Sequence, residues 1–384
     1  MSAPLAPTTA PPSIFATIGA LARRHGATNL GQGFPDFQPD PLLTDRLAYH
    51  AARGHNQYAP LAGVPRLREA IADKVALTQG LELDVDREIT ITSGATQGIW
   101  STIQAVVQAG DEVIIFEPAY DSYAPAVRSR GGRVVPMVLK GPDFRPDWDS
   151  FAERLSESTR LVIINNPHNP TGTCWRHTDL KRLESFLANT NTLLLSDEVY
   201  EHITFDGREH RCALRYPGLR DRTFVTASFG KTFHVTGWKV GYVLAHPILT
   251  DHFRSLHQFT VFTVNTPAQH ALADYLAEPS RYLTLPEFFA AKREQLRSGL
   301  ADTPLRVLPC EGSYFMLVDY SSISKEEDTS FAERLIKEVG VATVPVSPFY
   351  SEAPRGNHYL RMCFAKEQDT LARAIDQLQN LSVA

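Results

Sequence analysis

The pattern of apolar and polar positions between residues 88 and 245 predicts strands and helices that alternate along the chain. Continuously apolar runs, predicted as strands, lie at residues 88–92, 111–116, 133–139, 161–164, 192–195, 223–226 and 238–245. Residues at helical spacing, predicted as helices, lie between them at 99–108, 120–130, 147–156 and 178–188. Strands that are apolar on both faces are typical of a parallel sheet covered by helices on both sides. We therefore predict an α/β fold for this region.

The flanking regions have different patterns. Helical spacing predicts helices at 14–25, 41–54 and 64–79 before the alternating region, and at 249–258, 267–276 and 286–300 after it. From residue 305 the pattern changes to strands at 305–309, 314–319, 341–346 and 358–364, with helices at 331–339 and 370–381. This part of the chain is predicted to form a smaller α+β unit that is distinct from the large sheet.

Composition excludes several classes of protein. The 384 residues are 43% hydrophobic and 21% charged, as in ordinary soluble proteins, and the net charge of −5 without a basic block gives no indication of nucleic-acid binding. No apolar run approaches the ~20 residues that a membrane span needs. Residues 1–12, rich in Pro, Ala and Thr, predict a flexible arm rather than a signal peptide. Four widely spaced cysteines indicate neither a zinc site nor a disulfide framework, and they fit the cytoplasm.

Polar residues follow four of the predicted strands at the point where each strand ends. These residues are Gly94–Thr96, Asn166–Gly172, Asp197 with Tyr200, and Ser228 with Lys231. In open α/β sheets, ligands bind beyond the carboxyl ends of the strands, so we expect these residues to meet at one site. Gly94–Thr96 also opens a predicted helix, where free N–H groups and the helix dipole suit a phosphate.

An amine, an acid and a phosphate site together suggest pyridoxal 5′-phosphate (PLP). This cofactor withdraws electrons only if its pyridine nitrogen stays protonated, which requires a buried carboxylate such as Asp197. Lys231 offers the amine for a Schiff base. Tyr200 and Asn169 can donate hydrogen bonds to the ring oxygen, and Tyr120 can stack on the ring.

Two further groups of residues complete this candidate site. Ala95, Thr96, Ser228 and Lys239 can supply the N–H groups, hydroxyls and cation that a phosphate needs. Arg361 lies among apolar neighbours and needs an anion as partner. That anion is either a substrate carboxylate or the carboxylate of a structural ion pair.

These motifs resemble those of the fold-type-I PLP enzymes, class I/II aminotransferases, over essentially the whole chain. Within the family the sequence is most similar to the bacterial methionine aminotransferases and to the kynurenine aminotransferase/glutamine transaminase K group. The motifs that carry the resemblance lie at residues 31–37, 56–58, 166–172, 196–201, 228–233 and 237–241, and 265–269 matches the methionine enzymes. The resemblance implies a large PLP-binding domain at 45–275, with a mostly parallel seven-stranded sheet between helices. It also implies a small α+β domain at 276–384, with the N-terminal arm and part of the small domain at 1–44.

The resemblance also implies a role for each matching residue. Lys231 forms the aldimine with PLP, Asp197 binds the pyridinium nitrogen, Asn169 and Tyr200 bind the ring oxygen, and Tyr120 stacks on the ring. Ala95, Thr96, Ser228 and Lys239 hold the phosphate. Arg361, Asn169 and the Gly33 N–H hold the substrate carboxylate, while Phe15, Phe34, Thr96 and Phe262 of the partner subunit line an apolar pocket. Tyr58 reaches the phosphate of the neighbouring subunit, which implies a homodimer with shared active sites.

The predicted function is ping-pong transamination of an apolar or sulfur-containing L-amino acid, with methionine favoured and aromatic residues, Leu and Gln as further substrates, against a 2-oxo acid. Kynurenine and glutamine transamination is one alternative, although Phe15 and Thr263 stand where the kynurenine enzymes place Trp and His. A PLP-dependent cysteine-conjugate β-lyase is another. A non-catalytic PLP-binding regulator would need a DNA-binding domain, for which the short uncharged arm leaves no room. We expect no bound metal.

Overall fold

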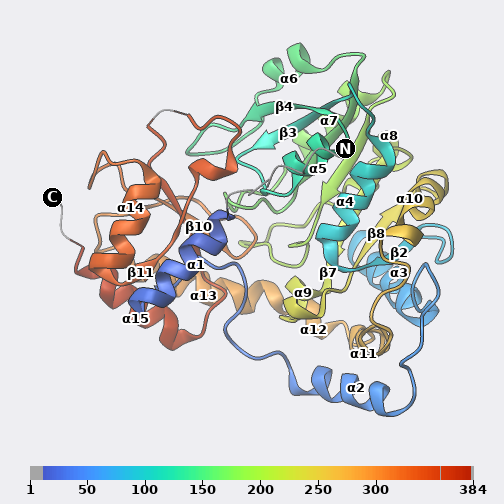
Figure 1. Ribbon diagram of the computed structural model, residues 1–384, viewed down its shortest axis with the longest axis horizontal. Coiled ribbons are helices and arrows are strands. Elements are labelled where there is room, and N and C mark those ends of the chain that lie inside the picture. The colour runs from blue at the N-terminus through green and yellow to red at the C-terminus, as the bar shows by residue number, and fades with distance from the viewer. Residues whose placement is uncertain (1–11, 355, 382–384) are drawn as a thin grey trace, which may run out of the picture.

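The computed structural model describes residues 12–354 and 356–381, so most of the predicted N-terminal arm lies outside the described residues. Figure 1 shows two groups of elements side by side. The larger group surrounds a seven-stranded sheet, and the smaller group contains both the first helix and the last helices of the chain. No helix among the described residues is long and apolar enough to cross a membrane.

The large sheet has the strand order β2-β8-β7-β6-β5-β3-β4. Its strands are β2 (Ile89–Thr92), β3 (Glu112–Glu117), β4 (Arg133–Val138), β5 (Thr159–Asn165), β6 (Leu193–Asp197), β7 (Thr223–Ser228) and β8 (Gly241–Ala245). β8 is antiparallel to both of its neighbours, and every other pair is parallel, so β2 points the same way as β5, β6 and β7. This confirms the predicted mostly parallel sheet, and it places the carboxyl ends of these strands at one edge.

Helices cover both faces of this sheet, because successive strand residues face opposite sides. On β3, Ile114 packs into one hydrophobic cluster and Ile115 into the other. The first cluster includes side chains of α6 (Trp148–Arg154) and α7 (His177–Leu187), and the second includes side chains of α4 (Gly94–Val106), α5 (Tyr123–Ser129) and α10 (Pro247–Thr260). The continuously apolar strands are therefore buried on both faces, as the sequence pattern predicted.

The second unit contains an antiparallel sheet with the order β12-β13-β10-β9 and a two-stranded parallel pair, β1-β11. The strands are β1 (Thr28–Asn29), β9 (Arg306–Val307), β10 (Phe315–Asp319), β11 (Val341–Ala342), β12 (Val344–Pro345) and β13 (Tyr359–Cys363). The accompanying helices are α1 (Ile14–His25), α13 (Leu285–Gly299), α14 (Asp328–Arg334) and α15 (Gln368–Gln379). Because β1 pairs with β11, the residues around 14–29 join the C-terminal unit.

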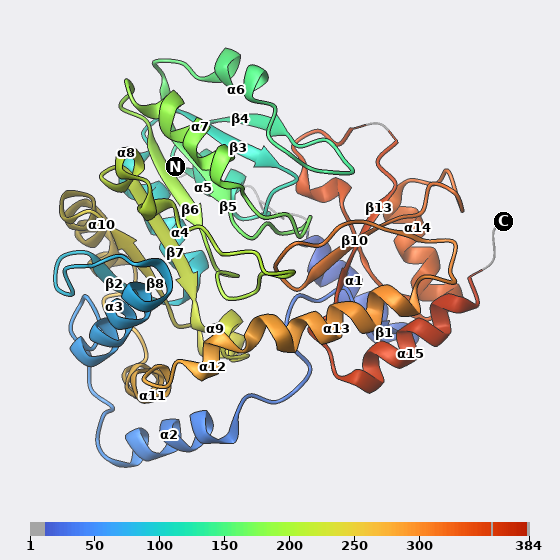
Figure 2. The same cartoon turned by 180° about the vertical axis from the view of Figure 1, so that it is seen from behind.

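The remaining helices are α2 (Pro41–Ala52), α3 (Pro65–Gln79), α8 (Pro217–Arg220), α9 (Phe229–Thr232), α11 (Thr266–Leu276) and α12 (Ser280–Leu283). Figure 2 shows α13 running from the region of the large sheet, beside α12, toward α15 in the second unit. The chain thus passes between the two units at α13 and in the segment before α2. The predicted domain boundaries at residues 44 and 275 stay a prediction.

Three sequence predictions need correction. The single strand predicted at 341–346 is two short strands in different sheets, because the chain leaves β1 after Ala342 and joins β13 at Val344. The strand predicted from Trp238 begins only at Gly241, since Thr236–Trp238 form a 3₁₀ turn and Lys239 has a left-handed φ of 55°. The helix predicted at 331–339 starts earlier, at Asp328, and its last turn, Leu335–Val339, is a π-helix.

Candidate active site

A cavity of about 320 Å³ lies at the carboxyl edge of the large sheet and receives side chains from both units. Residues that follow β2, β5, β6 and β7 line it, as the sequence analysis predicted. Because β8 runs in the opposite direction, its first residues lie at the same edge and bring Lys239 to the cavity. The lining residues with predicted roles are Phe15, Gly33, Phe34, Ala95, Thr96, Tyr120, Asn169, Asp197, Tyr200, Ser228, Lys231, Lys239 and Arg361.

Asp197, the last residue of β6, is the buried acid of the cavity, with 4% of its surface exposed. The Tyr123 hydroxyl donates a 2.5 Å hydrogen bond to its Oδ2, and the Val199 N–H lies 3.3 Å from its Oδ1. Burial raises the pKa of Asp197 to about 6, while the hydrogen bond from Tyr123 favours the charged form. The side chain is therefore an anion near neutral pH that is ready to pair with a cation.

Lys231 lies on the one-turn helix α9, directly after β7. Its Nζ donates a 3.2 Å hydrogen bond to the Gly33 carbonyl and lies 5.9 Å from the centroid of the Tyr200 ring. Burial lowers the pKa of Lys231 to about 8. The neutral, nucleophilic amine is therefore far more populated near neutral pH than in an exposed lysine.

Arg361 on β13 is 1% exposed and forms no ion pair within the described part of the chain. Its Nη1 donates to Asn169 Oδ1 at 2.7 Å, its Nη2 donates to the Gly31 carbonyl at 3.0 Å, and its Nε has no partner. The guanidinium carbon lies 3.9 Å from the centroid of the Phe315 ring. Burial removes water from the charged guanidinium and so lowers the pKa of Arg361. A bound anion would offset this loss of hydration. This excludes the structural ion pair that the sequence left open.

The first turn of α4 provides a site for an anion at the cavity wall. The N–H groups of Ala95 and Thr96 lie in this turn, where backbone donors have no partner within the helix. A Cβ placed on Gly94, whose φ is 74°, would lie 3.3 Å from Lys239 Nζ, so the lysine amine sits over the helix start. The arrangement combines N–H donors, the positive end of a helix dipole and a cation, and it suits a phosphate.

The other predicted residues occupy the walls of the cavity. Tyr200 is buried and lies edge-on to the Tyr314 ring, at 5.0 Å between centroids. Tyr120 also lines the cavity, and its ring centroid lies 5.7 Å from that of Tyr123. A Cβ on Gly33 would lie 2.7 Å from the Phe315 ring, so only glycine allows the backbone to approach this ring.

Two predicted residues do not line the cavity. Tyr58 is 78% exposed and Phe262 is 55% exposed, and they lie edge-on to one another at 5.2 Å between ring centroids. Both were assigned to a site that is shared with a second subunit, so their absence from the cavity of one chain does not contradict the prediction. Their proximity is a new observation, since they stand more than 200 residues apart in the sequence.

Several residues in or beside the cavity wall were not predicted from the sequence. Tyr123, which contacts the lining residue Asp197 without lining the cavity itself, could have been found, because it stands three residues after Tyr120 and the two ring centroids are 5.7 Å apart. Phe315 could not, because it comes from β10 of the second unit and reaches the cavity only through the packing of the two units. The remaining residues of this kind are Gln32, Ile99, Asn165, Val199, Gly230 and Thr236.

The donor set fits PLP. Asp197 is a buried carboxylate without a cationic partner within hydrogen-bond reach among the described residues. Lys231 is a buried amine of lowered pKa, and the start of α4 is an anion site. A cofactor with a pyridinium, an aldehyde and a phosphate would satisfy all three.

Comparison with known proteins agrees with this chemistry. Residues 26–378 match the model of the family "Aminotransferase class I and II". The methionine aminotransferase of Escherichia coli (strain K12) is 50% identical over 370 residues, covering 96% of each chain. A crystal structure from Escherichia coli, described as identifying a methionine aminotransferase function, superposes with a TM-score of 0.96 at 48% identity and covers 98% of this chain and 100% of the other.

A more distant relative is the human kynurenine–oxoglutarate transaminase 1, which is 32% identical over 398 residues, with 94% of each chain covered. The family match spans nearly all of the described residues, including the strand ends that form the cavity. The family model, the relatives and the geometry of the cavity therefore lead to the same conclusion. The chain belongs to the class I and II aminotransferases and is a PLP-dependent enzyme.

Proposed function

We propose that this enzyme transfers the amino group of L-methionine, and of other apolar L-amino acids, to a 2-oxo acid in a ping-pong reaction. The observation that carries the proposal is the buried Arg361, whose free Nε faces no acid among the described residues and whose guanidinium is flanked by aromatic rings. A carboxylate is the anion that this fork binds best, and aromatic neighbours favour an apolar side chain beside it.

PLP bound in this cavity supplies an aldehyde that condenses with amines and a protonated ring that withdraws electrons from the substrate Cα. We assign Asp197 to the ring nitrogen, because it is the buried anion. Tyr200 and the amide Nδ2 of Asn169 serve the ring oxygen, since Asn169 Oδ1 is already occupied by Arg361. Tyr120 lies against the ring face. Ala95, Thr96, Ser228 and Lys239 hold the phosphate.

Lys231 both anchors the cofactor and moves the proton. The lowered pKa of Lys231 would let its neutral Nζ accept a proton from the substrate Cα near neutral pH and later donate it within the same cavity. The carbonyl of Gly33 accepts a hydrogen bond from the free Nζ at 3.2 Å and so orients the unattached amine.

Arg361 and Asn169, with the N–H of Gly33, position the substrate carboxylate. Phe15 and Phe34 then border the space for the side chain, and Phe15 already packs beside the Arg361 guanidinium at 5.1 Å. A thioether gains ~0.3–1.5 kcal/mol from contact with an aromatic ring, which favours methionine in such a pocket. Besides Arg361, the only cations among the described residues that line the pocket are Lys231 and Lys239, and both are assigned to the cofactor. The side-chain carboxylate of aspartate would therefore find no cation of its own among these residues.

The enzyme is proposed to act as a homodimer in the cytoplasm. The exposed Tyr58–Phe262 pair supports a dimer, because two large aromatic rings on the surface are typical of an interface. Four cysteines that are buried and unpaired support a reducing compartment. We assign residues 45–275 to the large domain, residues 276–384 to the small domain, and residues 1–44 to the arm and part of the small domain.

An amino-donor panel tests the function. The purified enzyme is given each L-amino acid with a mixture of 2-oxo acids, and the new 2-oxo acid is quantified by mass spectrometry. We expect kcat/KM to be highest for methionine, followed by aromatic residues, Leu and Gln, and at least tenfold lower for aspartate. Preference for kynurenine would support the alternative transaminase, and pyruvate with ammonia from a cysteine conjugate would support the β-lyase.

A further inference from the structure

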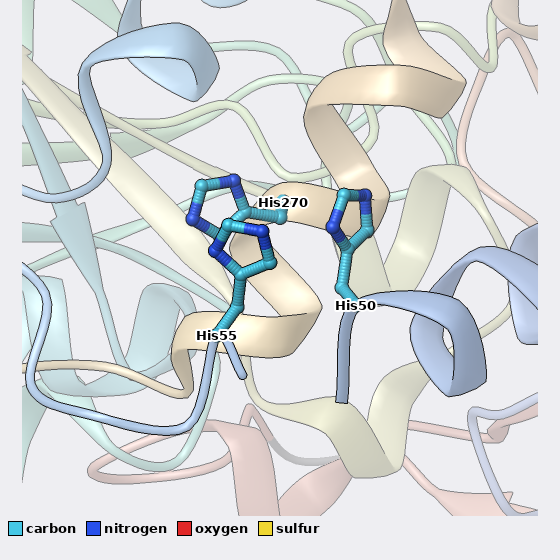
Figure 3. Close-up of side chains that lie close together, drawn as sticks. All are labelled: His50, His55 and His270. Atoms are coloured by element: carbon cyan, nitrogen blue, oxygen red, sulfur yellow. The ribbon is translucent and has the colours of Figure 1, made fainter. Parts of the chain in front are cut away.

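Three histidines gather outside the active site, on the face where α2 meets α11. His50 belongs to α2, His55 follows the end of α2, and His270 belongs to α11. One nitrogen atom from each imidazole lies within 4.8 Å of the others. Figure 3 shows the three side chains close together. The His55 and His270 rings are 4.0 Å apart between centroids, and His50 lies 5.2 Å from His270.

His50 is held in the orientation of a metal ligand. Its Nε2 lies 2.9 Å from Oδ2 of Asp274, a residue one helical turn after His270 on α11. Because the carboxylate accepts a hydrogen bond, Nε2 is the nitrogen that carries the proton when the imidazole is neutral. Its Nδ1 is buried without a hydrogen-bond partner, and the residue is only 5% exposed. Figure 3 shows a ring nitrogen of His50 turned toward the other two rings. A carboxylate that orients a histidine in this way is a common outer partner in zinc sites.

We propose that His50, His55 and His270 bind a divalent cation of the zinc type, which fastens α2 and the segment leading to Tyr58 onto α11. Imidazole nitrogens suit Zn²⁺ and its neighbours rather than Mg²⁺ or Ca²⁺. Tetrahedral ligands at about 2.0–2.1 Å from zinc stand roughly 3.3 Å apart, so the nitrogens must close by at most about 1.5 Å. Rotation of the two half-buried side chains, His55 and His270, supplies that movement.

The surroundings permit a cation. His50 and His55 line an open surface cavity, which gives the ion a path to the cluster. Among the described residues, three arginines line that cavity. Arg46 and Arg66 contact Asp274 at 4.0 Å and 2.5 Å, so the aspartate balances part of their charge, while Arg281 lies on the same cavity. A zinc ion bound by three imidazoles leaves its fourth position to water.

Equilibrium dialysis of the untagged holoenzyme against buffered Zn²⁺, with metal counted by mass spectrometry, tests the site. We expect one zinc per chain in the wild type and a Tm that rises by roughly 3–5 °C at a hundredfold excess over Kd. His55→Gln and His270→Gln should each weaken binding at least tenfold, and the double variant should bind none. His252→Gln, at an exposed position on α10, is the matched control and should bind like the wild type.

The variants replace half-buried rings with a polar side chain, so their Tm without zinc establishes that they fold. The proposal is overturned if the wild type binds no zinc, or if the folded double variant binds as much as His252→Gln. It is also overturned if inorganic phosphate raises the Tm and zinc does not, because the arginines would then define an anion site.

Discussion

The Tyr123 hydroxyl donates a 2.5 Å hydrogen bond to the Asp197 carboxylate, behind the wall of the cavity. Both residues are buried, and this bond favours the charged form of a carboxylate that burial would otherwise neutralise. In the proposed assignment Asp197 must be an anion to keep the pyridine nitrogen protonated, so we infer that Tyr123 is a positioning residue for cofactor binding.

Tyr123→Phe should therefore weaken PLP binding. Without the hydroxyl, the pKa of Asp197 rises above its value of about 6, and the carboxylate is partly protonated at pH 7. A hydrogen bond to a charged group contributes about 1.5–3 kcal/mol, so the Kd for PLP should rise by roughly 10–100-fold. Equilibrium dialysis measures this change. An unchanged Kd at pH 7 and pH 6 would show that the hydroxyl has no such role.

The two active-site lysines should respond differently to substitution. Lys231→Ala and Lys231→Arg should abolish turnover, because neither side chain can form a Schiff base or move the Cα proton near neutral pH. Lys239→Arg should keep turnover within about tenfold of the wild type, since a guanidinium also binds phosphate. Borohydride reduction followed by peptide mass spectrometry identifies the lysine that carries the cofactor. Label on Lys239, or activity in Lys231→Arg, would reverse the assignment.

The reactivity of Lys231 should depend on pH with a midpoint near 8. Burial lowers its pKa to about 8, and only the neutral amine attacks an aldehyde, so the reactive fraction increases as the pH rises through this value. The rate at which the apoenzyme captures PLP covalently should increase about tenfold from pH 6 to pH 7 and level off above pH 8.5. Stopped-flow absorbance follows the capture. A midpoint near pH 10 would mean that the Lys231 amine is exposed to water in the apoenzyme, and it would contradict this prediction.

Gly33→Ala should impair substrate binding more than folding. The added Cβ would lie 2.7 Å from the Phe315 ring and 3.8 Å from Arg361 Nη2, so the ring must move against the guanidinium. Overpacking of this kind costs about 1–3 kcal/mol. We expect a KM for methionine that rises at least tenfold, measured by steady-state kinetics. Gly54→Ala serves as the control: Gly54, unlike Gly33, has a positive φ of 90°, but an added Cβ there meets no atom within 4 Å, so KM should stay unchanged.

The large sheet and the edge at which the cavity lies could be predicted from the sequence, because both follow from local patterns. Asp197 and Lys231 each follow an apolar run directly, and parallel strands bring such positions together. Phe315 was missed because it reaches the cavity only through the packing of the second unit. Lys239 was placed on a strand because the left-handed turn at this residue has no distinctive residue pattern. Strands β11 and β12 were merged because no polar residue, apart from Thr343, separates them.

The central claim is that the cavity performs transamination, and one half-reaction tests it most directly. The PLP-loaded enzyme is mixed with excess L-methionine in the absence of any 2-oxo acid, and product and ammonia are counted against active sites. The account predicts one equivalent of the 2-oxo acid of methionine per chain, no ammonia, and renewed turnover only after a 2-oxo acid is added. Continued release of ammonia without an acceptor, or no 2-oxo acid at all, would contradict it.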